Sequence, residues 1–205
     1  MSTEKRHYEL KARAESQRHT RERIVRATMD LHREVGPART TIAEIARRAG
    51  VQRLTVYNHF PDEGDLLGAC QAHWLSLHPV PDLTAALALP DPRERLKTVL
   101  RAFYSWYRET ESMAEKVQGD RGVVAALDEH LRQTSDAGLA RITDALAAGF
   151  SDRGRATQRR RAMIRLALDF WTWRRLDREG CSDDSAAALM ADAVALSSPW
   201  EETRK

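Results

Sequence analysis

The segment QRLTVYNH, residues 52–59, concentrates hydrogen-bonding side chains that suit nucleic acid better than catalysis. If it is helical with Val56 facing inward, its outer face carries a set of polar groups: Arg53, Thr55, Asn58 and His59. A guanidinium can bind the O6 and N7 atoms of guanine with two hydrogen bonds, and hydroxyl, amide and imidazole groups can bind base edges or phosphates. The chain shows no Gly-rich phosphate loop, no metal-ligand spacing and no GxSxG motif.

Two short helices are expected to position these groups. Thr41 is a good N-cap for a first helix, and Gly50 can adopt the left-handed conformation that ends it. Val51 then packs into the core, and Val56 and Phe60 form the inner face of a second helix that starts near Gln52. Because each helix has only about two turns, both need a third helix for stability. The pattern predicts a helix-turn-helix whose second helix enters a DNA major groove.

The third helix and this pair together resemble a known family. RERIVRATMDLHREVG, followed by TTIAEIARRAGVQRLTVYNHFPDEGDLL, is similar to the N-terminal domain of TetR-type transcriptional repressors over residues 18–70. The resemblance implies that a set of side chains contacts DNA, with Asn58 exposed beside them: Thr41, Gln52, Arg53, Thr55, Tyr57 and His59. Arg53 is expected to read a base, whereas Tyr57 and Thr41 are expected to hold phosphates.

Two positions depart from the family pattern. Ala43 stands where many members have a basic residue, and Glu63 stands where a phosphate-binding lysine is usual. Residues 1–61 carry 13 Lys and Arg against 7 Asp and Glu, whereas the remainder carries 20 against 23. Basic residues of an N-terminal arm over 1–17 and just beyond are therefore candidates for backbone or minor-groove contacts: Lys5, Arg6, Lys11, Arg13 and Arg18. A solvated, disordered tail is the equal alternative.

The remaining sequence predicts an all-α fold. An amphipathic stripe from Ile24 to Val35 ends at Gly36-Pro37, and Asp62 can cap a helix that ends near His78. A proline-rich connection of about one helical turn follows from Val80. Further helices are expected over Leu96 to Tyr107, about 122–150, 156–178 and 183–197. We expect a helix-turn-helix domain over 18–64 and a larger helical domain over 65–205.

The resemblance implies that the larger domain binds a small molecule and dimerises through its last two helices. Two stripes fit such a surface, although a core helix would look the same: Ala186, Leu189, Met190, Ala193 and Val194, and Met163, Ala167, Phe170, Trp171 and Arg174. Candidate ligand-binding residues are mostly aromatic, with His130 and Arg121 able to orient a polar group: Phe103, Trp106, Tyr107, His130, Phe170 and Trp173. Aromatic side chains at helical spacing are also typical of plain core.

Composition narrows the class of protein. The charged N-terminus and the lack of an 18-residue apolar run predict a soluble cytoplasmic protein without membrane contact. Cys70 and Cys181 form no CxxC pair, so inert thiols are expected, with no metal and no cofactor. The sequence favours a homodimeric repressor, not an enzyme, that a small apolar or aromatic effector releases from a palindromic double-stranded DNA operator. The alternative is a helical enzyme or small-molecule carrier that has kept the N-terminal fold without reading DNA.

Overall fold

The computed structural model describes residues 3–151 and 153–197, and all regular elements within those ranges are helical, which confirms the all-α prediction. The chain forms two compact units. The first comprises the residues up to 79 together with 112–130, and the second comprises 80–111 together with the residues from 131 onward. No helix in the described ranges is long and apolar enough to cross a membrane.

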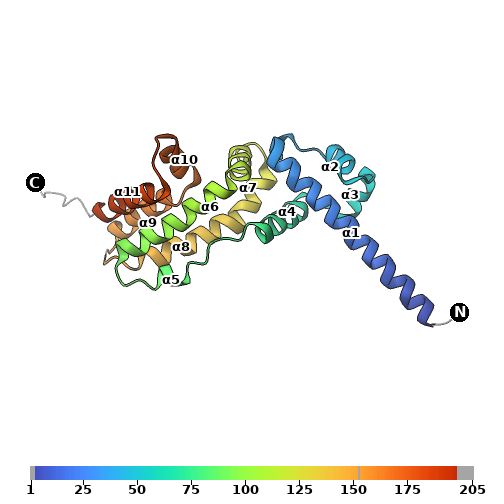
Figure 1. The fold of residues 1–205 in the computed structure, drawn as a ribbon, viewed down its shortest axis with the longest axis horizontal. Helices are drawn as coiled ribbons and strands as arrows, with labels where there is room; N and C mark the ends of the chain where they lie inside the picture. Colours follow the sequence, from blue (N-terminus) through green and yellow to red (C-terminus); the bar gives the residue numbers. More distant parts are fainter. Residues whose placement is uncertain (1–2, 152, 198–205) are drawn as a thin grey trace, which may run out of the picture. The chain divides into compact units, whose positions relative to one another are not determined.

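The first unit is built on α1, Thr3–Val35. The predicted stripe of Ile24, Ala27 and Leu31 is buried, and the helix ends where expected, at Gly36, whose φ is +89°. A 3-10 turn, η1, follows over Pro37–Arg39. In Figure 1 the first turns of α1 extend beyond α2 and α3.

The N-terminal arm is therefore helical from Thr3 and continuous with the rest of α1. The described part of the arm is thus helix, and its contact with DNA stays a prediction. The described side chains of this part are exposed, among them Lys11, Arg13 and Arg18. The side chains of Lys5 and Arg6 lie outside the described residues.

Three further helices pack on α1: α2, Ile42–Ala49; α3, Arg53–His59; and α4, Glu63–Leu77. Ile45, Val56 and Phe60 share one buried cluster with the apolar stripe of α1. Asp62 caps α4 as predicted, since its carboxylate accepts a hydrogen bond of 2.7 Å from the backbone N–H of Gly64. Helices as short as α2 and α3 need this shared core to be stable.

The end of α6, Pro92–Asp120, and α7, Ala125–Leu131, complete the first unit. Met113 packs with Met29, Cys70 and Trp74, and the Asp120 carboxylate accepts a 2.9 Å hydrogen bond from the backbone N–H of Ala38. A Cβ atom on Gly36 would collide with that carboxylate, so the Asp120 side chain would have to move to accommodate any other residue.

A buried cysteine and histidine lie together in this unit. The Sγ atom of Cys70 is 3.7 Å from Nδ1 of His32. Burial lowers the pKa of His32 to about 4, although the nearby Asp120 carboxylate acts in the opposite direction. Burial raises the pKa of Cys70 to about 12, so its thiol is unreactive near neutral pH, as the sequence suggests.

The second unit holds α5, Thr84–Leu87, most of α6, and α8 to α11. Their bounds are Ala137–Ala147 for α8, Arg155–Ala167 for α9, Phe170–Arg178 for α10 and Asp183–Leu196 for α11. The helix expected over 122–150 starts at Ala125 and runs through a π-helical segment, η2, at Arg132–Asp136 before α8. The single turn predicted after Val80 is α5.

The helix predicted over 156–178 is wrong as one element, because it breaks between α9 and α10. Asp169 N-caps α10 by accepting hydrogen bonds from the backbone N–H groups of Trp171 and Thr172. The Tyr104 hydroxyl donates a 2.7 Å hydrogen bond to the carbonyl of Ala167, and the Tyr107 hydroxyl donates one of 2.7 Å to the carbonyl of Leu168. Both new helix ends are thus satisfied, and burial raises the pKa of both tyrosines.

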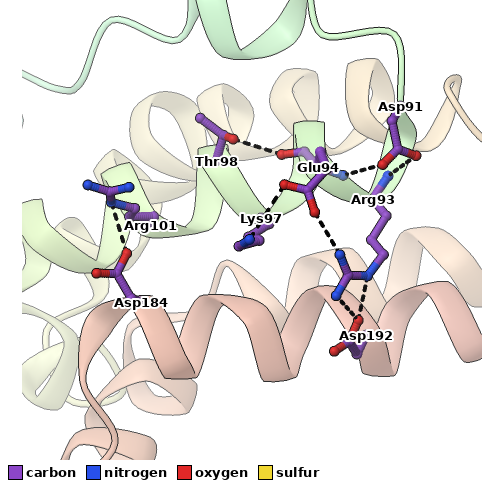
Figure 2. A network of polar contacts seen from close by, with 8 residues as sticks. All are labelled: Asp91, Arg93, Glu94, Lys97, Thr98, Arg101, Asp184 and Asp192. Carbon is purple, nitrogen blue, oxygen red and sulfur yellow. Dashed lines mark hydrogen bonds and ion pairs between the residues drawn. The ribbon is translucent and has the colours of Figure 1, made fainter.

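Ion pairs connect α6 to α11 within the second unit. Figure 2 shows Arg93 of α6 beside Asp192 of α11, 2.5 Å apart, and Arg101 beside Asp184, 3.0 Å apart. Arg93 and Lys97 also pair with Glu94 on their own helix. Exposed pairs of this kind add little stability individually.

Candidate nucleic-acid interface

The helix α3 separates an apolar inner face from a hydrogen-bonding outer face. Val56 and Phe60 are buried, whereas Arg53, Tyr57 and Asn58 are exposed and Thr55 and His59 are half-buried. Tyr57 retains 52% of its surface accessible. An amphipathic helix of this kind can be held by its inner face while its outer face enters a DNA groove.

The turn between α2 and α3 has the predicted geometry. The Thr41 hydroxyl accepts a hydrogen bond from the backbone N–H of Glu44 at 3.2 Å, and Gly50 has a φ of +64°, in the left-handed region. The N–H of Val51 donates to the carbonyl of Ala46 at 2.9 Å, which completes the helix end. Gln52 is the N-cap residue of α3 and is exposed.

Arg23 of α1 binds the end of α2 directly. Its Nε donates to the carbonyl of Ala49 at 2.9 Å, and its Nη2 donates to the carbonyls of both Ala49 and Gly50. Carbonyls at a helix C-terminus lack partners within the helix and carry partial negative charge. A guanidinium is well suited to this role, because several of its donors lie in one plane.

A second arginine of α1 contacts the C-terminal end of α3. The guanidinium carbon of Arg21 lies 4.2 Å from the centre of the Phe60 ring, a cation–π contact with the C-cap residue of α3. Arg21 and Arg23 therefore act on both ends of the segment from Gly50 to Phe60. The charge count identified the basic excess of this region, but it did not indicate that two of its arginines contact the segment from Gly50 to Phe60.

The two arginines of α2 pair with carboxylates of the same unit. Arg48 is 2.7 Å from Glu34, and Arg47 is 2.5 Å from Glu44. Ala43 is half-buried on the same helix. Glu63, the other departure from the family pattern, is the exposed first residue of α4, where the helix dipole favours a carboxylate.

All the predicted contact residues lie on α3 or at the N-caps of α2 and α3, and each is exposed or half-buried: Thr41, Gln52, Arg53, Thr55, Tyr57, Asn58 and His59. Sequence reasoning missed Leu54, whose side chain is 66% exposed on α3. It lies four residues before Asn58, and therefore on the same face. The signal was present in the sequence, since a helix with Val56 inward must turn Leu54 outward.

Comparisons with known proteins agree with this geometry. The family described as bacterial regulatory proteins, tetR family, matches residues 24–70, from the buried part of α1 into α4. Over these residues the chain is similar to the tetR family. The chain is 38% identical over 82 residues to the helix-turn-helix transcriptional regulator BetI of Yersinia pestis, a match that covers 38% of this chain and 41% of BetI.

A second relative extends the match a little further. A helix-turn-helix transcriptional regulator of Mycobacterium tuberculosis is 32% identical over 110 residues, which are 53% of this chain and 50% of that protein. The chain therefore matches about half or less of the length of these curated relatives. They leave about half or more of this chain unmatched in sequence.

Solved structures share the fold over nearly the whole chain. The fatty acid degradation regulator FadR from Bacillus halodurans superposes with a TM-score of 0.59 at 19% identity, covering 90% of this chain and 97% of its own. A TetR-family regulator from Syntrophomonas wolfei gives a TM-score of 0.58 at 18% identity, covering 91% and 99%. At this identity the likeness shows that most of this chain shares the fold of these structures.

The aromatic candidates of the second unit form one packed cluster. Tyr107 lies 5.6 Å from Phe170 and 5.9 Å from Trp173, and Phe103 lies 5.9 Å from Tyr107, between ring centres. Trp106, half-buried, contacts the rings of Phe103 and Tyr107. Trp173 is almost fully buried, and its indole N–H donates to Asp183 at 3.1 Å.

His130 belongs to the first unit, not to the aromatic cluster. Its Nε2 lies 2.8 Å from Oε1 of Gln71 on α4, and burial lowers its pKa. Arg121 pairs with Asp128 at 2.6 Å, where both line a surface hollow of about 560 Å³ at the turn between α6 and α7. Five of the six predicted ligand-binding residues therefore lie in this aromatic cluster, whereas the sixth, His130, lies on α7 and contacts Gln71 of α4.

Proposed function

We propose that this protein is a transcriptional repressor that binds operator DNA through the exposed face of α3. The observation that carries the proposal is that α3 has a polar, exposed outer face while its inner face is packed in the core of the first unit. Arg53, Asn58 and Tyr57 are exposed on a helix whose inner residues are buried. Helix α1 binds the end of α2 through Arg23 and contacts the C-cap residue of α3, Phe60, through Arg21. In this proposal Arg53 and Asn58 read bases, and Tyr57 and Thr41 bind phosphates.

Two copies of the chain are proposed to bind a palindromic operator, because one recognition helix offers few base contacts. Exposed apolar side chains of the second unit support a homodimer, namely Leu166, Trp171 and Leu189 on α9, α10 and α11. Ala186, Met190 and Val194, from the stripe that the sequence suggested, are instead buried in the core of their own unit.

The effector is proposed to be a small apolar or aromatic molecule that binds beside the aromatic cluster. Trp106 is the half-buried member through which such a molecule would reach the buried rings. The effector can weaken DNA binding only by as much as it prefers one conformer of the protein over the other.

A gel-shift experiment with the DNA upstream of the protein's own gene tests the proposal. We expect a discrete shifted complex that survives an excess of random competitor DNA, with two chains bound per operator. A protein that shows no preference for any sequence, even at low salt, would instead be a helical binding protein or enzyme with a retained N-terminal fold.

A further inference from the structure

Leu54 is an exposed leucine on the surface that the proposed function assigns to DNA. Its side chain is 66% exposed, more than that of Tyr57 at 52%. Its neighbours on the outer face of α3 are hydrogen-bonding groups, among them Arg53 and Asn58. A leucine in this place contributes nothing to the core of the chain, which α3 reaches through Val56.

The direction of the side chain follows from helix geometry. Residues two apart on a helix point about 200° apart, so Leu54 points away from the buried Val56. Asn58 lies one turn later on the same face. When α3 enters a groove with its outer face inward, Leu54 and Asn58 are the side chains that point most directly at the base pairs.

The major groove offers one apolar partner to such a side chain. The edges of guanine, cytosine and adenine present hydrogen-bond donors and acceptors there, whereas thymine also presents its C5-methyl group. A leucine placed against any other edge would remove water from polar atoms without replacing their hydrogen bonds. A leucine against the thymine methyl buries apolar surface on both sides.

We propose that Leu54 is a specificity-determining residue that recognises the C5-methyl group of a thymine in each operator half-site. The inference rests on the proposed function and adds a base preference to it. Because Asn58 follows at about 6 Å along the helix and suits adenine, the thymine lies within about two base pairs of an adenine on either strand.

The test compares thymine with deoxyuridine, which lacks only the methyl group. An operator is first enriched from random duplex DNA with the full chain, and each thymine is then replaced in turn by deoxyuridine. We expect one position per half-site at which the replacement weakens binding about fourfold, the value for one buried methyl group. Elsewhere the replacement should have no effect, and 5-methylcytosine at that position should bind more tightly than cytosine.

Two variants connect the effect to the side chain. Leu54→Ala should bind the thymine and deoxyuridine operators equally well. Leu77→Ala, which alters a leucine 54% exposed on α4, should keep the fourfold difference. Equal binding of every deoxyuridine operator by the natural protein, or an unchanged difference in Leu54→Ala, would overturn the inference. Failure to enrich any operator is a separate result, which would overturn the proposed function itself.

Discussion

Removal of the Arg23 guanidinium should loosen the helix-turn-helix without affecting the second unit. Arg23 donates to the carbonyls of Ala49 and Gly50, the last two of the α2 end. A hydrogen bond to a charged group contributes about 1.5–3 kcal/mol when it is protected from water. Since Arg23 is exposed and water can replace it, we expect Arg23→Ala to lower the free energy of opening α2 and α3 by about 1–2 kcal/mol.

Native-state hydrogen exchange measures this change directly. A loss of 1–2 kcal/mol corresponds to roughly 5- to 30-fold faster exchange for amides that exchange through local opening. We expect this acceleration in peptides covering residues 41–60 and none in peptides from α9 and α11. Arg23→Lys should recover only part of the protection, because an ammonium group lacks the planar set of donors that reaches both carbonyls.

Arg26→Ala is the matched control, since Arg26 is an exposed arginine of α1 within one turn of Arg23. It should leave exchange in residues 41–60 unchanged. Equal acceleration in both variants, or acceleration spread evenly over the chain, would refute the idea that Arg23 acts as a local clamp on the turn.

Three further predictions concern Glu63, His32 and the two tryptophans. Glu63→Lys should cost about 0.3–1 kcal/mol of stability at the start of α4, yet it should tighten binding to all DNA sequences alike. The dependence of log K on log[salt] should steepen by about one unit per bound domain, and an unchanged slope would show that Glu63 does not face DNA. Because the pKa of His32 is lowered to about 4 in the folded protein, the unfolded chain binds a proton between about pH 4 and 6.5 that the folded chain does not. The free energy of unfolding should therefore be highest above about pH 6.5 and fall by up to about 3 kcal/mol as the pH falls toward 4. Thermal melts in which His32→Gln shows the same pH dependence would contradict this assignment. Trp173→Ala should destabilise the protein by about 3–5 kcal/mol as a buried aromatic, whereas Trp106→Ala should change the effector response more than the melting temperature; equal losses of stability would mean that both are core residues.

Local signals in the sequence predicted the parts of the fold that depend on short-range physics. The stop at Gly36 requires a positive φ, and Asp62 satisfies the first backbone donors of the helix that follows it. The turn at Gly50 is likewise a property of a few adjacent residues. These features depend on interactions within one turn of a helix, so they can be predicted from a few neighbouring residues in the sequence.

Features that depend on distant partners were not predictable in this way. The break at Asp169 is stabilised by tyrosine hydroxyls that lie more than sixty residues earlier in the chain. The roles of Arg21 and Arg23 also depend on which groups the fold brings to them, and a charge count cannot distinguish such a clamp from a phosphate contact. Leu54 was overlooked for another reason, because the search for DNA contacts considered only hydrogen-bonding side chains and Leu54 is apolar.

Titration of the protein with its enriched operator and with random DNA of equal length, by fluorescence anisotropy, tests the central claim most directly. At physiological salt we expect the operator to bind about a thousandfold or more tightly than random DNA. Arg53→Ala should reduce operator affinity by about 1–3 kcal/mol and leave random-sequence binding nearly unchanged. Equal affinity for both DNAs, or equal weakening of both by Arg53→Ala, would contradict base reading by the outer face of α3.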